Sequence, residues 1–312
     1  MNMELNIAMP EVSAPSISSG AMLVELSISV WTARRGDKEA KRKLDALTGA
    51  NDDVYNITKK LTGDDPRLDK IRKHAASTRT NIHYHYTLPW SDTGPRLLTT
   101  ACYFDYTKRM TEAQEQHNKM AAEYIAGFDD TVERVIANSP PGTFRRSEFP
   151  TQFQLRQKFG FRVNYSPVPE QGDWRVDVNN EARSELAAQY ADFYQRKTVE
   201  AMQDVWQRAN KALTHVSERL ADPEPGFTGV VTKEGRKKFS ETLLEDMMEM
   251  VDLMKRCNIT NDEKMRRAER RLSDALLGIT TDAVKYDPHL RNSTKQEIDK
   301  VIADLPSLDM GC

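Results

Sequence analysis

The chain has 312 residues, of which 38% are hydrophobic and 29% charged, and its 45 Lys and Arg nearly balance its 47 Asp and Glu. This composition indicates a folded protein with apolar material for one large or two moderate domains, and the charge balance excludes a global field that would recruit nucleic acid or an acidic membrane. Any electrostatic binding site must therefore be local.

The cysteines and the apolar runs bear on the compartment. Cys102, Cys257 and Cys312 are an odd number without metal-ligand spacing, which favours a reducing compartment and no structural disulfide. The first twenty residues lack the pattern of a signal peptide, and no apolar run approaches the ~20 residues of a membrane span. We expect a cytoplasmic protein that has no membrane partner.

The N-terminal part predicts a flexible arm followed by a small head. Residues 1–20 mix Pro, Ser, Gly and Ala and favour an arm, whereas 22–31 alternate apolar and polar residues as a half-buried strand does. Basic residues then suggest a helix over 31–43, and 53–62 and 66–79 suggest further short helices.

Two long helices are the strongest prediction. Residues 97–136 and 181–220 carry apolar residues at alternating three- and four-residue steps and contain no proline, a pattern typical of an antiparallel, coiled-coil-like pair. Helices of about 40 residues reach about 60 Å, which suits spanning or scaffolding. Between them, 161–165 and 174–178 alternate like a β-hairpin, and 22–31 is a candidate third strand.

The C-terminal part predicts a helical bundle, with helices at 236–256, 261–278 and 293–304. The expected fold class is mainly α with a small antiparallel β-sheet, a long antiparallel coiled-coil-like helical hairpin and a helical C-terminal bundle. The expected organisation in chain order is an arm (1–20), a strand with a basic helical head (21–94), the helical hairpin (95–221) with an inserted β-hairpin (158–178), a linker (222–235), a helical region (236–306) and a tail (307–312).

A basic cluster is the first candidate binding surface. Such clusters neutralise phosphates, and nearby aromatic side chains could stack on bases; interleaved acidic residues favour instead a solvated or subunit-facing surface. The candidate contacts for nucleic acid or a partner are Arg34, Arg35, Lys38, Lys41, Arg42, Lys43, Tyr84, Tyr86 and Trp90.

His83 and His85 lie in the densest aromatic stretch of the chain. An extended backbone would put them on one face with the spacing of a metal pair, but no third ligand is identifiable. We therefore expect packing and hydrogen bonding here, with Trp90 as an anchor and no metal.

A methionine-rich helix is the second candidate surface. Methionine suits an adaptable partner groove and equally fills cores. Because apolar residues cover more than one face of this helix, we expect burial partly within the subunit and partly against an oligomer or partner, through Met247, Met248, Met250 and Met254.

No catalytic signature accompanies these features. The chain contains no phosphate-binding loop, no dinucleotide fingerprint, no His-Glu-x-x-His and no Gly-x-Ser-x-Gly. We expect no enzyme activity and no cofactor; a site built from scattered residues, an enzyme of unknown class, is the third alternative.

Several segments resemble a family of bacteriophage and bacterial proteins of unknown function. The matching landmarks are LVELSISVWTARRGDK, HYTLPWSDTGPRLL followed by YFDY, FGFRVNYSPVP with WRVDV, and VWQRANKALTHVSERL. Members are often encoded near a MoxR-type AAA+ ATPase and a von Willebrand-type protein, which implies an ATPase-associated adaptor; the resemblance provides no catalytic residues to carry over to this chain.

These observations favour a non-enzymatic phage adaptor or scaffold in the host cytoplasm. It would self-associate as a homo-oligomer and engage a protein machine, with an AAA+ ATPase as the candidate. The alternative is an accessory protein of phage DNA metabolism that binds or anneals single-stranded nucleic acid.

Overall fold

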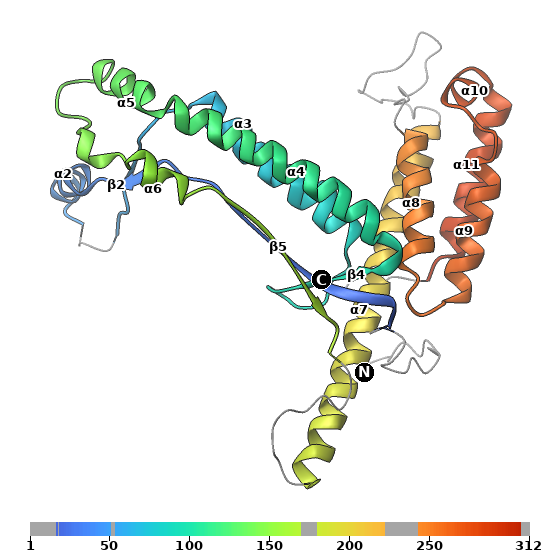
Figure 1. Cartoon of the computed structure of the whole chain (residues 1–312). Helices are drawn as coiled ribbons and strands as arrows, with labels where there is room; N and C mark the ends of the chain where they lie inside the picture. Colours follow the sequence, from blue (N-terminus) through green and yellow to red (C-terminus); the bar gives the residue numbers. More distant parts are fainter. Residues whose placement is uncertain (1–16, 18, 51–53, 170–179, 222–242, 307–312) are drawn as a thin grey trace. The chain divides into compact units, whose positions relative to one another are not determined.

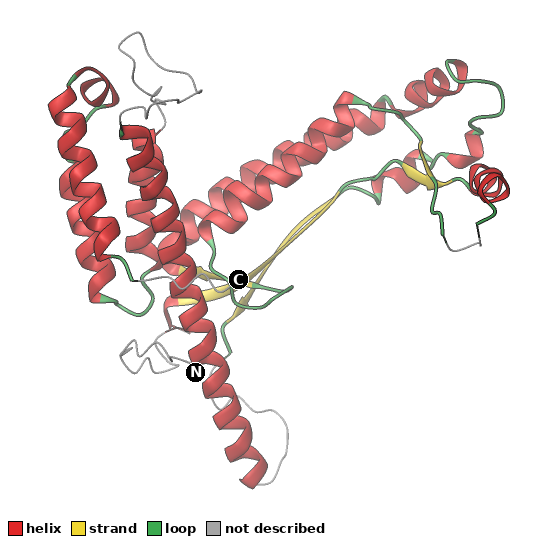
Figure 2. Ribbon diagram, turned by 180° about the vertical axis from the view of Figure 1, so that it is seen from behind, coloured by secondary structure: helices red, strands yellow, loops and turns green. Residues whose placement is uncertain are grey.

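The computed structural model describes residues 17, 19–50, 54–169, 180–221 and 243–306. As the sequence predicts, the fold is mainly helical with a small antiparallel sheet (Figures 1 and 2). Within the described ranges, no helix combines the length and apolar character needed to cross a bilayer. The predicted linker at 222–235, the tail at 307–312 and most of the arm lie outside the described residues.

The chain forms two compact units, each assembled from separated segments. Unit 1 contains Met1–Val24, Tyr86–Phe104 and Tyr165–Cys312, and unit 2 contains Glu25–His85 and Asp105–Asn164. Unit 2 has 22 Lys and Arg against 17 Asp and Glu, a net charge of +5, whereas unit 1 has 23 against 30, a net charge of −7. The nearly neutral total therefore combines a positive unit with a negative one.

A three-stranded sheet has the order β4-β1-β5, built from β1 (Ala21–Ser29), β4 (Arg96–Thr99) and β5 (Gly160–Pro167). The strand predicted at 22–31 is confirmed. Ala21 pairs with Thr99 in the antiparallel register of β1 and β4, so the first residues predicted as helix at 97–136 form a buried strand instead. The strand predicted at 174–178 lies outside the described residues, and β5 pairs with β1.

Unit 2 contains a second, two-stranded sheet where the sequence favoured helices. A left-handed Ala33 (φ 53°) precedes β2 (Arg34–Gly36), which pairs with β3 (Thr58–Lys60). The helix predicted over 31–43 is therefore wrong in its first half: α2 (Lys38–Thr48) begins after Asp37, whose side chain accepts a hydrogen bond from the Ala40 amide. The helix predicted at 53–62 is also wrong, since 58–60 are a strand.

The remaining elements of unit 2 are mainly helical. They are α3 (Pro66–Ser77), the π-helix η1 (Thr78–Tyr84), α4 (Thr100–Ala126) from Asp105 onward, α5 (Phe128–Ala137), η2 (Arg146–Glu148) and α6 (Gln152–Arg156). The continuous helix predicted over 97–136 is broken at Gly127, a poor helix former. A Cβ at this position would lie 2.9 Å from the guanidinium of Arg67, so the glycine makes room for that side chain.

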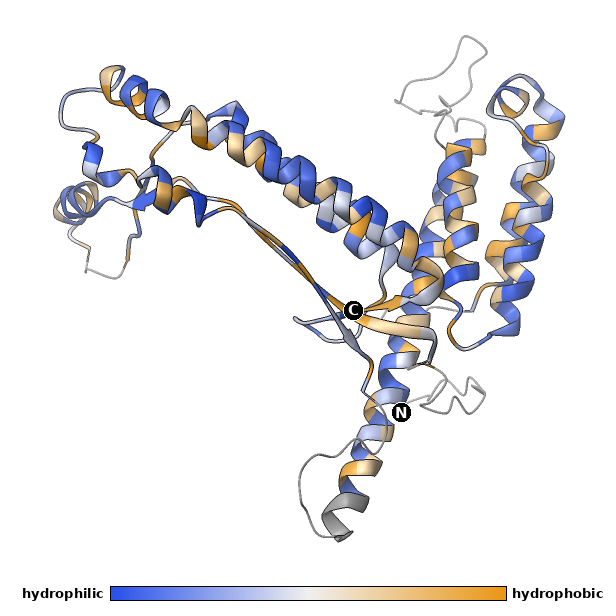
Figure 3. Cartoon of the chain, viewed as in Figure 1, coloured by the Kyte–Doolittle hydropathy of each residue, from blue (hydrophilic) through white to orange (hydrophobic). Residues whose placement is uncertain are grey.

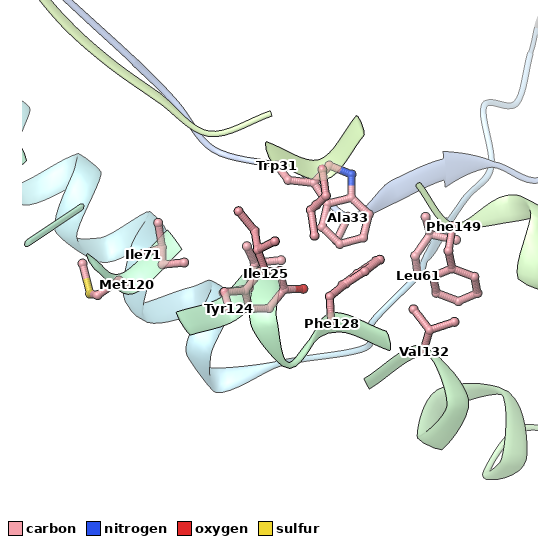
Figure 4. Close-up of a cluster of buried hydrophobic side chains, with 12 residues drawn as sticks. Trp31, Ala33, Leu61, Ile71, Met120, Tyr124, Ile125, Phe128, Val132 and Phe149 are labelled. Carbon is pink, nitrogen blue, oxygen red and sulfur yellow. The ribbon is translucent and has the colours of Figure 1, made fainter. Parts of the chain in front are cut away.

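Aromatic side chains lie at the centre of the core of unit 2 (Figure 4). The ring of Phe128 meets the edge of Trp31 at a centroid distance of 5.4 Å, and Tyr124 lies 6.1 Å from Phe128. Residues from four separate stretches of chain thus converge here: Trp31, Ala33, Leu61, Leu68, Ile71, Met120, Tyr124, Ile125, Phe128, Val132, Phe149 and Leu155.

Unit 1 is built on the long helix α7 (Asn180–Leu220), close to its predicted bounds. It packs against α8 (Leu243–Cys257) and α11 (Pro288–Asp304), and α9 (Glu263–Leu276) packs against both of these, while α10 (Thr281–Tyr286) packs on α11. The helical C-terminal region is thus confirmed. The predicted hairpin of 97–136 with 181–220 is not confirmed; the helices that pack most extensively against α7 are α8 and α11.

A buried arginine ties α11 to the end of α7. Arg291 donates from Nε to the Leu220 carbonyl (2.8 Å) and from a terminal nitrogen to the Arg219 carbonyl (2.7 Å). These are among the last carbonyls of α7, which have no partner within their own helix. A cation at a helix C-terminus is also favoured by the helix dipole.

Candidate functional site

The two-stranded sheet of unit 2 places cations directly opposite one another. In its register Arg34 faces Lys60 and Arg35 faces Lys59. Because side chains alternate along a strand, these are two separate pairs on opposite faces of the sheet. Like charges directly opposite each other are destabilising, so each pair calls for a neutralising group.

The Arg35 and Lys59 pair is bound within the chain by one carboxylate and by backbone carbonyls. Lys59 Nζ lies 2.8 Å from Glu148 Oε1 and donates to the Thr143 carbonyl, and Arg35 donates to the Glu148 carbonyl at 3.0 Å. Burial acts to raise the pKa of Glu148, but the hydrogen bond from Lys59 opposes it and the pKa is lowered overall. Arg35 therefore holds the loop at 143–148 in place.

In the pair of Arg34 and Lys60, only Arg34 is open. Lys60 contacts Asp64 at 2.8 Å, an ion pair in which both side chains are exposed, and Arg34 is exposed with no ion-pair partner among the described residues. This face therefore keeps a positive charge that an external anion could neutralise.

Helix α2 has a cationic face and an apolar face. Lys41 pairs with Asp45 and Lys43 with Glu39. Lys38 and Arg42 are exposed, lie one turn apart, and make no ion pair within the part of the chain that the structure describes. Like charges at this spacing are destabilising, as is a lysine at the start of a helix.

The apolar face of α2 is formed by Ala40, Leu44 and Leu47, at a spacing that places it on the side opposite Lys38 and Arg42. Ala40 and Leu44 are half-buried, and Leu47 is 84% exposed. Among its eleven residues, all of them described, none is buried. The sequence analysis noted the cations of this segment and missed Leu47.

The aromatic residues predicted to accompany the cations are divided between the units. Tyr84 belongs to unit 2 and is exposed. Tyr86, which is half-buried, and Trp90, which is buried, belong to unit 1. Trp90 is only 4% exposed and packs edge-on against Tyr194 (5.3 Å) and Phe193 (6.2 Å). It anchors unit 1, and no face of it is open to a base.

The methionine-rich helix α8 divides its side chains between core and surface. Met247 and Met254 are buried, Met250 is half-buried and Met248 is 60% exposed. Two of the four predicted contacts therefore belong to the core of unit 1, and Met248 is the side chain open to a partner.

Two histidines of unit 2, His83 and His117, are buried. His83 Nδ1 lies 2.9 Å from the Tyr106 hydroxyl, and within the described part of the chain no three or more His, Cys, Asp or Glu side chains are grouped as metal ligands. His117 on α4 is buried, and neither ring nitrogen has a hydrogen-bond partner among the described residues. Burial lowers its pKa, with smaller contributions from His74 and Arg79.

We expect His117 to make the stability of the protein depend on pH. Because its pKa is lower in the folded state than the usual 6.5, the unfolded chain binds more protons, and the free energy of unfolding falls as the pH drops below that value. In urea titrations over this range, His117→Phe should make the fall shallower and leave stability at alkaline pH no lower, since an apolar ring leaves no unpaired polar atom. An unchanged slope would contradict this role.

Comparison with protein-family models, with curated proteins and with solved structures finds no match. The candidate site therefore stands on its own geometry. It comprises α2 with its two faces and the open Arg34, which lies opposite Lys60 in the two-stranded sheet.

Proposed function

We propose that the chain is a non-enzymatic adaptor or scaffold that self-associates and engages a protein machine, an AAA+ ATPase being the candidate that the sequence resemblance implies. The observation that carries the proposal is α2. Helices of this length are marginal in water, and helices in proteins take most of their stability from packing of an apolar face. A helix with no buried residue and an 84% exposed Leu47 is therefore suited to docking in a groove of a partner (Figure 3 shows both hydrophilic and hydrophobic residues on it).

Other uncovered apolar side chains support the same function. In the C-terminal helices of unit 1, Met248, Leu277 and Tyr286 are all more than half exposed. Singly exposed apolar residues are common on proteins, so the three carry less weight than α2. They offer a surface for self-association at a distance in sequence from the docking helix.

A comparison of two single variants, Leu47→Glu and Ala46→Glu, tests the docking helix. Both changes add one negative charge to neighbouring exposed positions of α2, but only the first lies on the apolar face. We expect Leu47→Glu to weaken binding to a MoxR-type AAA+ ATPase, the candidate partner, by about tenfold in calorimetry, since a charge would enter an apolar groove, and Ala46→Glu to bind like wild type. Equal affinities for the two variants would contradict docking through this face.

The second candidate is binding of single-stranded nucleic acid, favoured by the open cations Arg34, Lys38 and Arg42. Arg34 and Lys60 face each other across the sheet, and Lys38 and Arg42 lie one turn apart on α2. Phosphates would relieve both like-charge pairs. The net charge of +5 on unit 2 favours the approach of such a strand.

Reversing three of these charges tests that candidate. Because each phosphate contact contributes about 0.7 to the salt slope for a single strand, the Arg34→Glu, Lys38→Glu, Arg42→Glu variant should bind single-stranded DNA with a slope smaller by about 2 in fluorescence anisotropy. The matched control reverses Lys264, Arg267 and Arg270 on α9, which are also exposed. If both variants lose affinity equally, the binding is a matter of net charge and not of this face.

A further inference from the structure

Two cysteines far apart in the sequence meet inside unit 1. Cys102 lies in the first turn of α4 and Cys257 is the last residue of α8. Both side chains are fully buried free thiols, and the Cys257 thiol hydrogen-bonds to Cys102. Neither residue takes part in the docking helix or the cation pairs.

The surroundings of the pair favour chemistry at Cys102. The hydrogen bond from Cys257 is the largest effect; it outweighs burial, which acts to raise the pKa, and lowers the pKa of Cys102 to about 7. The pKa of Cys257 is raised, because its proton is held in the bond to Cys102. The Cys102 thiol therefore ionises more readily, and the neighbouring Cys257 stays protonated. This is the arrangement of an attacking and a resolving cysteine.

We propose that Cys102 and Cys257 are a reversible disulfide site, which closes with a peroxide as the oxidant and opens with a dithiol reductant. The Cys102 thiol releases its proton, the thiolate attacks one peroxide oxygen, the O–O bond breaks, and a sulfenic acid and hydroxide form; the hydroxide takes up the released proton and becomes water. The Cys257 sulfur then attacks the sulfenic sulfur, the S–O bond breaks, and a second water leaves. Two thiols and one peroxide thus give one disulfide and two waters.

Such a bond would fasten the first turn of α4 to the end of α8. Residues 100–104 of α4 belong to unit 1, and the helix continues from Asp105 into unit 2. The site therefore acts at the point where the chain leaves unit 1.

Peptide mapping of the oxidised protein tests the proposal. Trypsin separates the three cysteines into peptides 97–108, 257–264 and 301–312. The native full-length protein is treated with hydrogen peroxide over a time course, acid-quenched and alkylated under denaturing conditions; a urea-unfolded sample is treated in parallel. The expected result is a linked pair of peptides 97–108 and 257–264, with equal losses of their alkylated forms, reversed by dithiothreitol and retained in Cys312→Ser.

Two outcomes would overturn the site. One is that the native protein forms disulfide-linked peptides that contain Cys312, in the same proportion as the unfolded sample. The other is that Cys102 and Cys257 stay fully alkylated over the time in which the unfolded chain is oxidised. Because wild type and Cys312→Ser carry the test, it does not depend on whether variants of the buried cysteines fold.

Discussion

Replacing Phe128 by alanine lowers the free energy of unfolding of unit 2 by about 3–5 kcal/mol, the range for deleting a large buried aromatic side chain. Its ring is fully buried and meets Trp31 edge-on at 5.4 Å and Tyr124 at 6.1 Å. Removing the ring leaves a cavity in the core of unit 2. The contacts of the ring with Trp31 and Tyr124 are lost as well. Urea unfolding followed by tryptophan fluorescence measures the change, because Trp31 reports on this core.

The matched control is Phe153→Ala on α6. Phe153 is the same residue type in the same unit but is 72% exposed, so its loss should change the unfolding free energy by only about 0.5 kcal/mol. If the two variants were equally stable, the aromatic cluster would not be the core that stabilises unit 2.

The second large effect is expected at Arg291. Arg291→Met should lower the free energy of unfolding of unit 1 by about 2–4 kcal/mol, because the Leu220 and Arg219 carbonyls lose their donors in a site that excludes water. The methionine keeps much of the apolar volume, so the loss reports the hydrogen bonds and the charge at the end of α7.

Thermal and urea unfolding followed by circular dichroism measure this loss beside Arg270→Met. Arg270 is an exposed arginine on α9 in the same unit, and its replacement should change stability by no more than about 0.5 kcal/mol. A stability of Arg291→Met equal to that of this control would show that the end of α7 is held by other contacts.

Elements with a long, regular pattern could be predicted from the sequence. The stripe of α7 and the alternation of β1 are local properties of their own residues, and both were predicted within a few residues of their bounds. The partners of these elements are not local properties. Nothing in residues 181–220 distinguishes a second long helix from α8 and α11 as the cover for the same stripe.

Short elements failed for a related reason. Four of the six residues at 34–36 and 58–60 are Arg or Lys and a fifth is Gly, none of which favours a strand, and the two segments are strands because they pair with each other. Composition likewise identified the basic cluster, but not which cations are neutralised: Lys59 is paired through Glu148, far along the chain, and Arg34 is left open. The exposure of Leu47 follows only from the packing of unit 2.

Light scattering coupled to size-exclusion chromatography tests the central claim, that this is an adaptor that self-associates. The protein is run at tens of micromolar with and without a short single-stranded DNA, at low and at moderate salt. We predict a defined oligomer whose mass is indifferent to DNA at either salt concentration. A monomer under all conditions, or a mass that rises with DNA and falls back with salt, would contradict it, and the second result would make the face of Arg34, Lys38 and Arg42 the functional site.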